Sequence, residues 1–153
     1  MESKERRKSA DPKLADFLCF AIYSANLAFG KAYRPMLEKL GLTYTQYVTM
    51  VALSEEDGQT VGGLGERLFL ESNTLTPILK KLEAMDYVER HRDPADERQV
   101  RVSLTKTGRR LRETSFDADL TEACGLTEQG FARLQKEIVQ LRNSLVANTR
   151  GEG

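Results

Sequence analysis

The hydrophobic period of the chain changes just after Met85, and this change limits the folds open to it. Up to Met85, apolar residues recur at three- and four-residue intervals that predict a helix: Leu75, Ile78, Leu79 and Leu82. From Tyr87 onward the pattern alternates in two segments, Tyr87–His91 and Gln99–Leu104, which a charged turn at 92–98 separates. Two short alternating segments joined by such a turn predict a β-hairpin. The fold class is therefore mainly α with one small hairpin.

The N-terminal segment predicts one long helix with an apolar face. Asp11-Pro12 is a favourable start, because the missing N–H of proline costs little in a first turn. The helical pattern continues past an expected kink at Pro35 and ends at Gly41, a typical C-cap. Its apolar residues share one face: Leu14, Phe17, Leu18, Ala21, Ile22, Ala25 and Phe29. A helix this long and apolar needs a partner, and we expect a second copy of the chain.

Two shorter helices lead into the helix that ends at Met85. The first runs from Gln46 to about Ser54 after caps at 43–45, and the second spans Thr60–Leu68. A turn at 69–72 follows. Two helices joined by a short turn, followed by a hairpin, are the parts of a winged helix-turn-helix.

Helical signals resume after the hairpin at Thr105. Leu111, Phe116 and Leu120 fit a fifth helix with a frayed end, and Thr127 is a suitable N-cap for a last helix. The last helix carries an apolar stripe of the kind that forms dimers: Phe131, Leu134, Ile138, Leu141 and Leu145.

Composition excludes several classes of protein. Hydrophobic residues make up 40% and charged residues 30% of 153 residues, as in a soluble globular domain rather than a disordered chain. No apolar run approaches the ~20 residues of a membrane span, and no signal peptide is evident. Cys19 and Cys124 show neither a secreted disulfide framework nor metal-ligand spacing. We therefore expect a cytoplasmic protein without a membrane contact, metal or other cofactor.

The net charge is zero, but it is unevenly distributed. Residues 88–112 hold eight Lys and Arg against four Asp and Glu, a net charge of +4. Residues 113–153 hold four against seven, a net charge of −3. A basic stretch limited to one part of the chain suits a nucleic-acid surface, although a solvated face is also compatible with it.

The fourth helix and the hairpin carry the candidate DNA contacts. Pro77 is tolerated best in a first turn, so this helix should begin near Asn73 or Thr74. Its start presents small polar groups that can meet base edges and phosphates, and basic side chains follow on the helix and hairpin. Singly, these residues cap a helix or are solvated; together, in this order, they indicate DNA binding. The candidates are Ser72, Asn73, Thr74, Thr76, Lys80, Arg90, Asp96 and Arg98.

The turn of the hairpin carries a family resemblance. Residues 93–105 resemble the wing of MarR-type regulators, with Asp96 and Arg98 matching the D-x-R element, and residues 64–82 look like the family's recognition-helix region. The resemblance covers about residues 14–145. It implies a single MarR-type domain over 1–153 that forms an intertwined homodimer. The dimerisation elements would be about 12–45 and 113–148, and the winged helix-turn-helix about 46–112.

Cys19 lies in the first helix among apolar and phenolic side chains, with Tyr23 one turn further on. A buried structural cysteine is inert, whereas a stabilised thiolate reacts with oxidants, and phenolic O–H groups can donate to a thiolate. The residues alone leave both interpretations open.

A second resemblance bears on this thiol. Residues 18–23, 33–35 and 42–47 look like the organic-hydroperoxide-sensing, OhrR-type branch of MarR regulators, in its two-cysteine form. The resemblance implies that Cys19 is the peroxidatic thiol and that Cys124 of the other subunit is the resolving cysteine. An incidental surface thiol is the alternative for Cys124. The implied pocket around Cys19 comprises Phe20, Tyr23, Tyr33 and Tyr44.

Together these features predict a repressor rather than an enzyme. Reduced protein would bind a pseudo-palindromic double-stranded operator, and an organic hydroperoxide would oxidise Cys19 and release it. One alternative is a regulator that binds a small phenolic or aromatic ligand non-covalently, with Cys19 structural. A thiol peroxidase is the other, and it is disfavoured because no second catalytic group is patterned beside Cys19.

Overall fold

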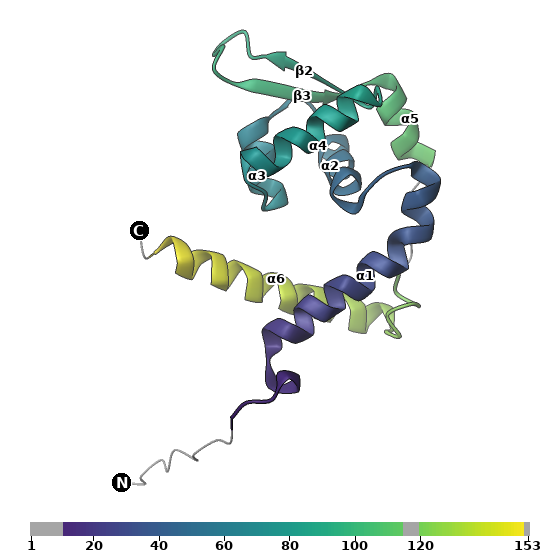
Figure 1. Ribbon diagram of the computed structural model, residues 1–153, viewed down its shortest axis with the longest axis vertical. Helices are drawn as coiled ribbons and strands as arrows, with labels where there is room; N and C mark the ends of the chain where they lie inside the picture. Colours follow the sequence, from purple (N-terminus) through teal and green to yellow (C-terminus); the bar gives the residue numbers. More distant parts are fainter. Residues whose placement is uncertain (1–10, 115–119, 152–153) are drawn as a thin grey trace. The chain divides into compact units, whose positions relative to one another are not determined.

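The computed structural model describes residues 11–114 and 120–151 (Figure 1). The chain divides into two compact units, one ending at Phe116 and one beginning at Asp117. The first unit holds the short 3-10 turn Leu14–Asp16, α1 (Leu18–Leu40), α2 (Tyr44–Glu55), β1 (Gln59–Thr60), α3 (Val61–Leu68), α4 (Ser72–Ala84), β2 (Val88–Arg92), β3 (Val100–Leu104) and α5 (Lys106–Thr114). The second unit holds α6 (Glu128–Arg150). The expected mainly helical, winged helix-turn-helix architecture is confirmed.

Helix α1 begins later than the Asp11-Pro12 pair suggests. The backbone N–H of Asp16 donates to the carbonyl of Lys13 at 2.8 Å and closes a single 3-10 turn, and the Lys13 N–H donates back to Oδ2 of Asp16 at 3.0 Å. Phe17 then adopts an extended backbone, so the α-helix starts at Leu18. It continues through Pro35 to Gly41, whose φ of +68° is the left-handed C-cap conformation that glycine adopts without strain.

The sheet has three antiparallel strands in the order β1-β3-β2. Strands β2 and β3 form the expected hairpin, with Val88 opposite Leu104 and Arg92 opposite Val100, each strand beginning one residue later than its pattern. Strand β1 was missed in the sequence. Only two residues long, it pairs Gln59 with Val102 across a wide sequence separation, so no local alternation marks it.

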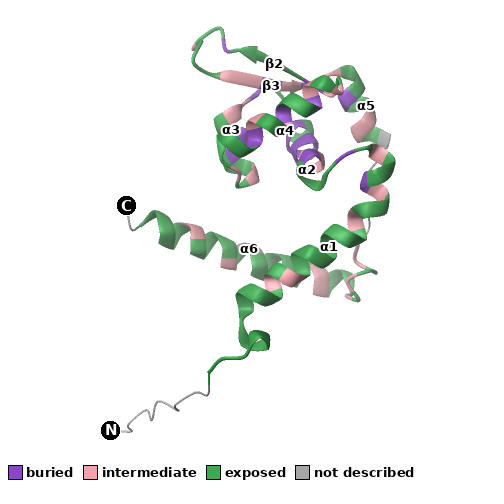
Figure 2. Ribbon diagram, viewed as in Figure 1, coloured by how far each residue is buried: buried purple, intermediate pink, exposed green. Residues whose placement is uncertain are grey.

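Helices α2, α3 and α4 pack with the sheet around one core, and we call α2–α5 with the three strands the winged lobe. Buried residues gather in this lobe (Figure 2). The side chains of Leu64, Leu79 and Val102 are fully buried, and they come from α3, α4 and β3. This burial supplies the main stabilisation of the lobe and holds α4 on the rest of the domain.

Helix α4 starts at Ser72, earlier than Pro77 suggests. The carbonyl of Glu71 accepts the N–H groups of Thr74 and Leu75, at 3.0 and 2.9 Å, and so fixes the first turn before the proline. Pro77 therefore lies inside α4, and the expected start at Asn73 or Thr74 is wrong by one or two residues. Burial of Leu75 and Leu79 on either side of the proline outweighs its cost in local propensity.

The start of α5 contacts Tyr87, the residue directly before β2. The N–H of Thr105 donates to the carbonyl of Tyr87 at 3.1 Å, and the Thr105 hydroxyl caps the helix by accepting the N–H of Gly108. A Cβ atom at Gly108 would overlap the same Tyr87 carbonyl oxygen. Of the residues expected to continue α5, Phe116 lies outside the described residues and Leu120 is not helical.

Helix α6 begins as its sequence predicts. The Thr127 side chain accepts the N–H of Gly130 at 3.0 Å and acts as the N-cap. Within the described part of α6 no residue is buried, and Leu134, Ile138 and Leu145 on the predicted apolar stripe are exposed.

Candidate DNA-binding surface and thiol site

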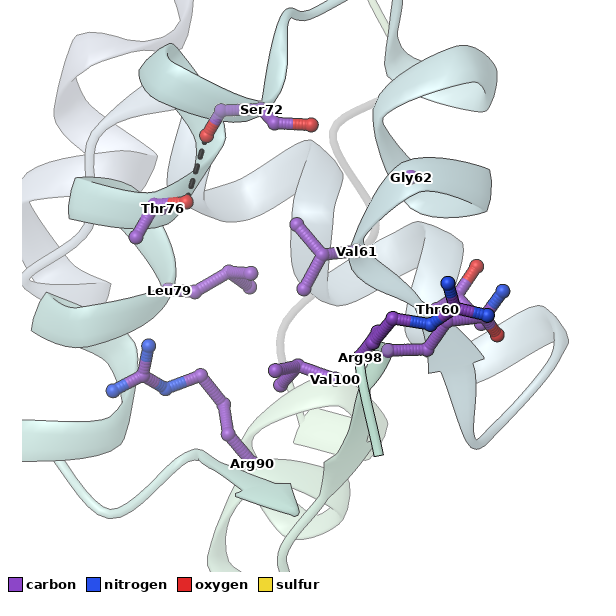
Figure 3. A pocket seen from close by; sticks show the side chains of 10 residues that line it. Thr60, Val61, Gly62, Ser72, Thr76, Leu79, Arg90, Arg98 and Val100 are labelled. Carbon is purple, nitrogen blue, oxygen red and sulfur yellow. Dashed lines mark hydrogen bonds between the residues drawn. The ribbon is translucent and has the colours of Figure 1, made fainter. Parts of the chain in front are cut away.

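The start of α4 presents its polar side chains to solvent. Ser72, Asn73 and Thr74 are exposed, as is Lys80 two turns further along the helix. Thr76 is half-buried, and its hydroxyl donates to the carbonyl of Ser72 at 2.7 Å (Figure 3). The expected outward face of α4 is thus present. The hydroxyl proton of Thr76, however, is already used in the hydrogen bond to the helix backbone.

A pocket of about 350 Å³ lies between the start of α3, α4 and the hairpin (Figure 3). Val61, Leu79 and Val100 supply apolar lining, while Arg90 and Arg98 supply cationic groups. The polar face of α4 and the hairpin therefore meet along one surface.

Arg98 is the most exposed of the arginines that form ion pairs in the described hairpin. Its side chain is 92% exposed, and its Nε lies 3.2 Å from Oδ1 of Asp96. The same oxygen accepts the Arg98 backbone N–H at 3.2 Å. The two residues of the D-x-R element thus pair with each other, and the pair orients the arginine at the tip of the hairpin while adding little stability.

The guanidinium of Arg90, one of the expected DNA contacts, is held by Glu83 of α4. Nη2 lies 3.0 Å from Oε1 of Glu83, and both Nε and the Arg90 backbone N–H donate to Oε2. The hydrogen bonds from Arg90 lower the pKa of the Glu83 carboxyl. Arg90 therefore joins the hairpin to α4.

A second ion pair lies at the turn end of the hairpin, directly after β2. The Arg101 Nε lies 2.8 Å from Oδ2 of Asp93, and its Nη1 donates to the carbonyl of Gly58 at 2.7 Å. The N–H of Ala95 donates to Asp93 Oδ1 at 2.9 Å. This backbone hydrogen bond, followed by that from Arg101, lowers the pKa of the buried Asp93 carboxyl.

Cys19 lies in the first turn of α1 and is exposed in the single chain. Phe20 and Tyr23 are exposed beside it, with ring centroids 6.3 Å apart. A helix rises 1.5 Å per residue, so Tyr33 lies about 21 Å further along α1. Within one chain the fold therefore brings Cys19 near Tyr23 but not near Tyr33 or Tyr44.

Three tyrosines form a cluster where α1 faces α2. The Tyr33 and Tyr44 rings are 5.4 Å apart, and Tyr47 lies 6.3 Å from Tyr33 and 6.5 Å from Tyr44. The pKa of the Tyr47 phenol is raised, chiefly by burial. Arg112 opposes this rise, and Tyr44 adds to it. Tyr33 and Tyr44 also line a pocket of about 380 Å³ with Leu27, Phe29 and two smaller residues.

Cys124 lies in the turn that precedes α6. Its side chain is half-buried, and its backbone N–H donates to the carbonyl of Leu120 at 2.8 Å. The two cysteines lie in different compact units.

Sequence reasoning did not single out Glu83 or Asp93 as site residues. Asp93 and Arg101 stand close in sequence with opposite charges, which is a usable signal for a hairpin pair. Glu83 belongs to a helical pattern and Arg90 to an alternating one, so their contact depends on packing. No group of His, Cys, Asp or Glu within residues 11–114 and 120–151 is arranged to hold a metal ion. Among the described helices, none has the length and apolarity to cross a membrane.

Comparison with known proteins identifies the relatives of this chain. A family profile described as transcriptional regulator SarA/Rot matches residues 31–114. The HTH-type transcriptional regulator TtmR of Methylorubrum extorquens is 53% identical over 103 residues, which are 67% of this chain and about half (53%) of TtmR. The organic hydroperoxide resistance transcriptional regulator of Bacillus subtilis is 39% identical over 133 residues, or 87% of each chain.

Solved structures agree with these relatives. AbfR of Staphylococcus epidermidis superposes with a TM-score of 0.74 at 34% identity, covering 88% of this chain and 92% of AbfR. Reduced AbfR bound to DNA superposes with a TM-score of 0.71 at 36% identity, covering 86% and 93% of the two chains. The disulfide form of AbfR gives a TM-score of 0.59 at 37% identity, covering 84% and 91%. The resemblance to MarR-type regulators is therefore confirmed, and the chain belongs to the SarA/Rot family of MarR-like winged-helix transcriptional regulators.

Proposed function

We propose that this transcriptional regulator is a homodimeric repressor that senses organic hydroperoxides through oxidation of Cys19. The observation that carries the proposal is the position of Cys19, an exposed thiol one helical turn from Tyr23, in a chain that is 39% identical to an organic hydroperoxide resistance regulator. A reduced and a disulfide form of the similar protein AbfR support a redox switch in this family.

The winged lobe supplies the DNA-binding surface. The start of α4 enters the major groove of the operator, where Ser72, Asn73 and Thr74 meet base edges and phosphates. Lys80 adds attraction that does not depend on sequence. Arg98, exposed at the hairpin tip and oriented by Asp96, enters the adjacent minor groove.

The thiol site is completed by a second copy of the chain. Since Cys19 and Tyr33 are about 21 Å apart along one helix, the Tyr33–Tyr44 pair can reach a Cys19 thiol only from the other subunit. The exposed apolar faces of α1 and α6 support such a dimer, because burial of these faces is favourable. Phe20 and Tyr23 then lie at the dimer interface beside the thiol and give the hydroperoxide an apolar environment.

Oxidation proceeds in two steps, formation of a sulfenic acid and then of a disulfide. The Cys19 thiol attacks the hydroperoxide ROOH, whose O–O bond breaks to give a sulfenic acid and the alcohol ROH. The thiol of Cys124 in the other subunit then attacks the sulfenic sulfur, forming a disulfide and releasing water. The new covalent bond changes the spacing of the two winged lobes, and the operator is released.

A fluorescence-anisotropy titration of the operator complex with cumene hydroperoxide tests this proposal. We expect the unmodified protein to release DNA near one equivalent per subunit, and Cys19→Ser to stay bound. Non-reducing electrophoresis should show a covalent dimer that is lost in both Cys19→Ser and Cys124→Ser. Equal release by the unmodified protein and Cys19→Ser contradicts the thiol switch.

A second candidate function rests on the pocket of about 380 Å³ beside Tyr33 and Tyr44. Its lining from Leu27 and Phe29, with two phenols, suits a small phenolic or aromatic ligand bound without covalent chemistry. Under this alternative, Cys19→Ser responds normally to the ligand, and cumene hydroperoxide has no effect on operator binding. The same titration therefore separates the two candidates.

A further inference from the structure

We propose that Glu83 is a positioning residue for DNA binding, which fixes the hairpin against the recognition helix α4 by holding Arg90. The inference rests on the proposed minor-groove contact of Arg98, which belongs to the same hairpin. It reassigns Arg90 from a DNA contact to the ion pair that connects α4 with the hairpin.

The contact between Glu83 and Arg90 is bidentate, with the backbone N–H of Arg90 as a further donor. One carboxylate of α4 accepts three N–H groups of a single strand residue: the Arg90 backbone N–H at 3.1 Å, Nε at 3.3 Å and Nη2 at 3.0 Å. Arg90 stands opposite Val102 in the hairpin, and the Val102 side chain is fully buried. The contact therefore acts where the hairpin is already anchored in the core, and it fixes the direction in which the strands leave the lobe.

Burial and charge make Arg90 a poor DNA contact. Its side chain is 26% exposed, against 92% for Arg98. The Arg90 guanidinium reaches from β2 toward α4 and lies on the pocket lining (Figure 3). A phosphate would have to compete with a carboxylate that already binds two of the guanidinium nitrogens, and bidentate pairs of this kind are the strong ones.

A second ion pair also restrains the hairpin. Arg101, which pairs with Asp93 at the turn end of the hairpin, also donates to the carbonyl of Gly58. With one fixed contact to α4 and another to the turn after α2, the hairpin cannot pivot without breaking one of them. Arg98, which is three residues before Arg101, is then presented to DNA at a set distance from the start of α4. Loss of Glu83 should therefore weaken binding through Arg98.

A double-mutant cycle on operator binding tests the inference, with Glu83→Gln, Arg98→Ala and their combination. Arg98→Ala should weaken binding about tenfold, as expected for one arginine contact. Glu83→Gln should also weaken binding by roughly tenfold, although it removes a negative charge near DNA. In the Glu83→Gln background the cost of Arg98→Ala should fall below about threefold, because the misdirected hairpin no longer delivers the arginine.

Two controls separate positioning from charge and from direct contact. Glu97→Gln removes the same charge from the exposed hairpin turn and should leave binding unchanged or tighter. Arg90→Lys keeps the positive charge but cannot make the bidentate contact with Glu83, so it should weaken binding as Glu83→Gln does. Amide hydrogen exchange at Arg90, measured on DNA-free protein, should accelerate in Glu83→Gln while circular dichroism remains unchanged.

The outcomes are distinct. Normal or tighter operator binding by Glu83→Gln, or costs of Glu83→Gln and Arg98→Ala that simply multiply, would overturn the inference. A loss of affinity in Arg90→Ala but not in Arg90→Lys, with the salt dependence reduced by about one ion, would make Arg90 a direct phosphate contact. No effect of Arg98→Ala in the unmodified protein would instead remove the minor-groove contact from the proposed function.

Discussion

The winged lobe buries its apolar side chains within one chain, whereas α1 and α6 leave most of theirs exposed. In the lobe, Leu64 and Leu79 are fully buried. In α1 only Leu37 is buried, and in the described residues of α6 none is. The lobe therefore has a hydrophobic core of its own, whereas the apolar side chains of the two long helices would gain stabilisation from being covered. Substitutions in the two regions should therefore differ in how strongly they change stability. They should also differ in whether that change depends on protein concentration.

The largest effect is expected for Leu64→Ala in the lobe. Removal of this fully buried side chain of α3 leaves a cavity and should lower the free energy of unfolding by about 2–5 kcal/mol. Urea denaturation at a concentration low enough for monomers measures it. A loss below about 1 kcal/mol would show that the lobe repacks and does not depend on this core.

The next effect is expected for Ile138→Asp on α6. If the second copy covers this face, a charge there should weaken dimer association about 30-fold or more. Sedimentation over a concentration series measures it, and the circular dichroism of the lobe should not change. Gln140→Asp places the same charge on the opposite side of α6 and serves as the control. Equal association of the two variants would remove Ile138 from the interface.

An intermediate and pH-dependent effect is expected for Asp93→Asn at the turn end of the hairpin. The Ala95 N–H and Arg101 lower the pKa of the Asp93 carboxyl in the folded protein, so its stabilisation is present above its unfolded pKa of about 3.9. It is lost as the pH falls through the lower, folded value. The unmodified protein should thus be more stable than Asp93→Asn at pH 7, and their urea midpoints should converge below about pH 4. A difference that persists in acid would contradict this assignment.

The smallest effect is expected for Thr127→Ala at the start of α6. Loss of the side-chain acceptor of the Gly130 N–H should cost about 1 kcal/mol. Amide exchange at residues 128–130 measures it directly, and Thr127→Ser should restore protection because serine caps equally well. A cost that appears only in the dimer would show that α6 is ordered by its partner and not by its own cap.

The sequence predicted best what local chemistry decides. Gly41 and Thr127 end and begin helices through their own backbone and hydroxyl groups, so their roles were evident from the pattern. The hairpin followed from its alternation. Strand β1 was missed because its two residues form a strand only by pairing with β3. The start of α4 was misplaced because burial of Leu75 outweighs the preference of Pro77 for a first turn.

The candidate site was predicted as a set of residues but not as an arrangement. Arg90 has the charge and position of a DNA contact, and only the packing of α4 on β2 brings Glu83 to it. Cys19, Tyr33 and Tyr44 were grouped by resemblance, yet the length of α1 places Cys19 far from both tyrosines within one chain. Pairings between elements, and between copies, are set by tertiary contacts that no local pattern encodes.

Residue 108 is a position of the lobe at which almost no residue other than glycine can be accommodated. Every side chain begins with a Cβ atom, and at this point of α5 that atom would occupy the space of the Tyr87 carbonyl oxygen. In a library that randomises residue 108 and is selected for operator binding, glycine should be recovered nearly alone, whereas a library at exposed Gly62 should return many residues. The closeness of α5 to the hairpin would then be readable from sequences alone, as an invariant glycine three residues after the Thr105 cap.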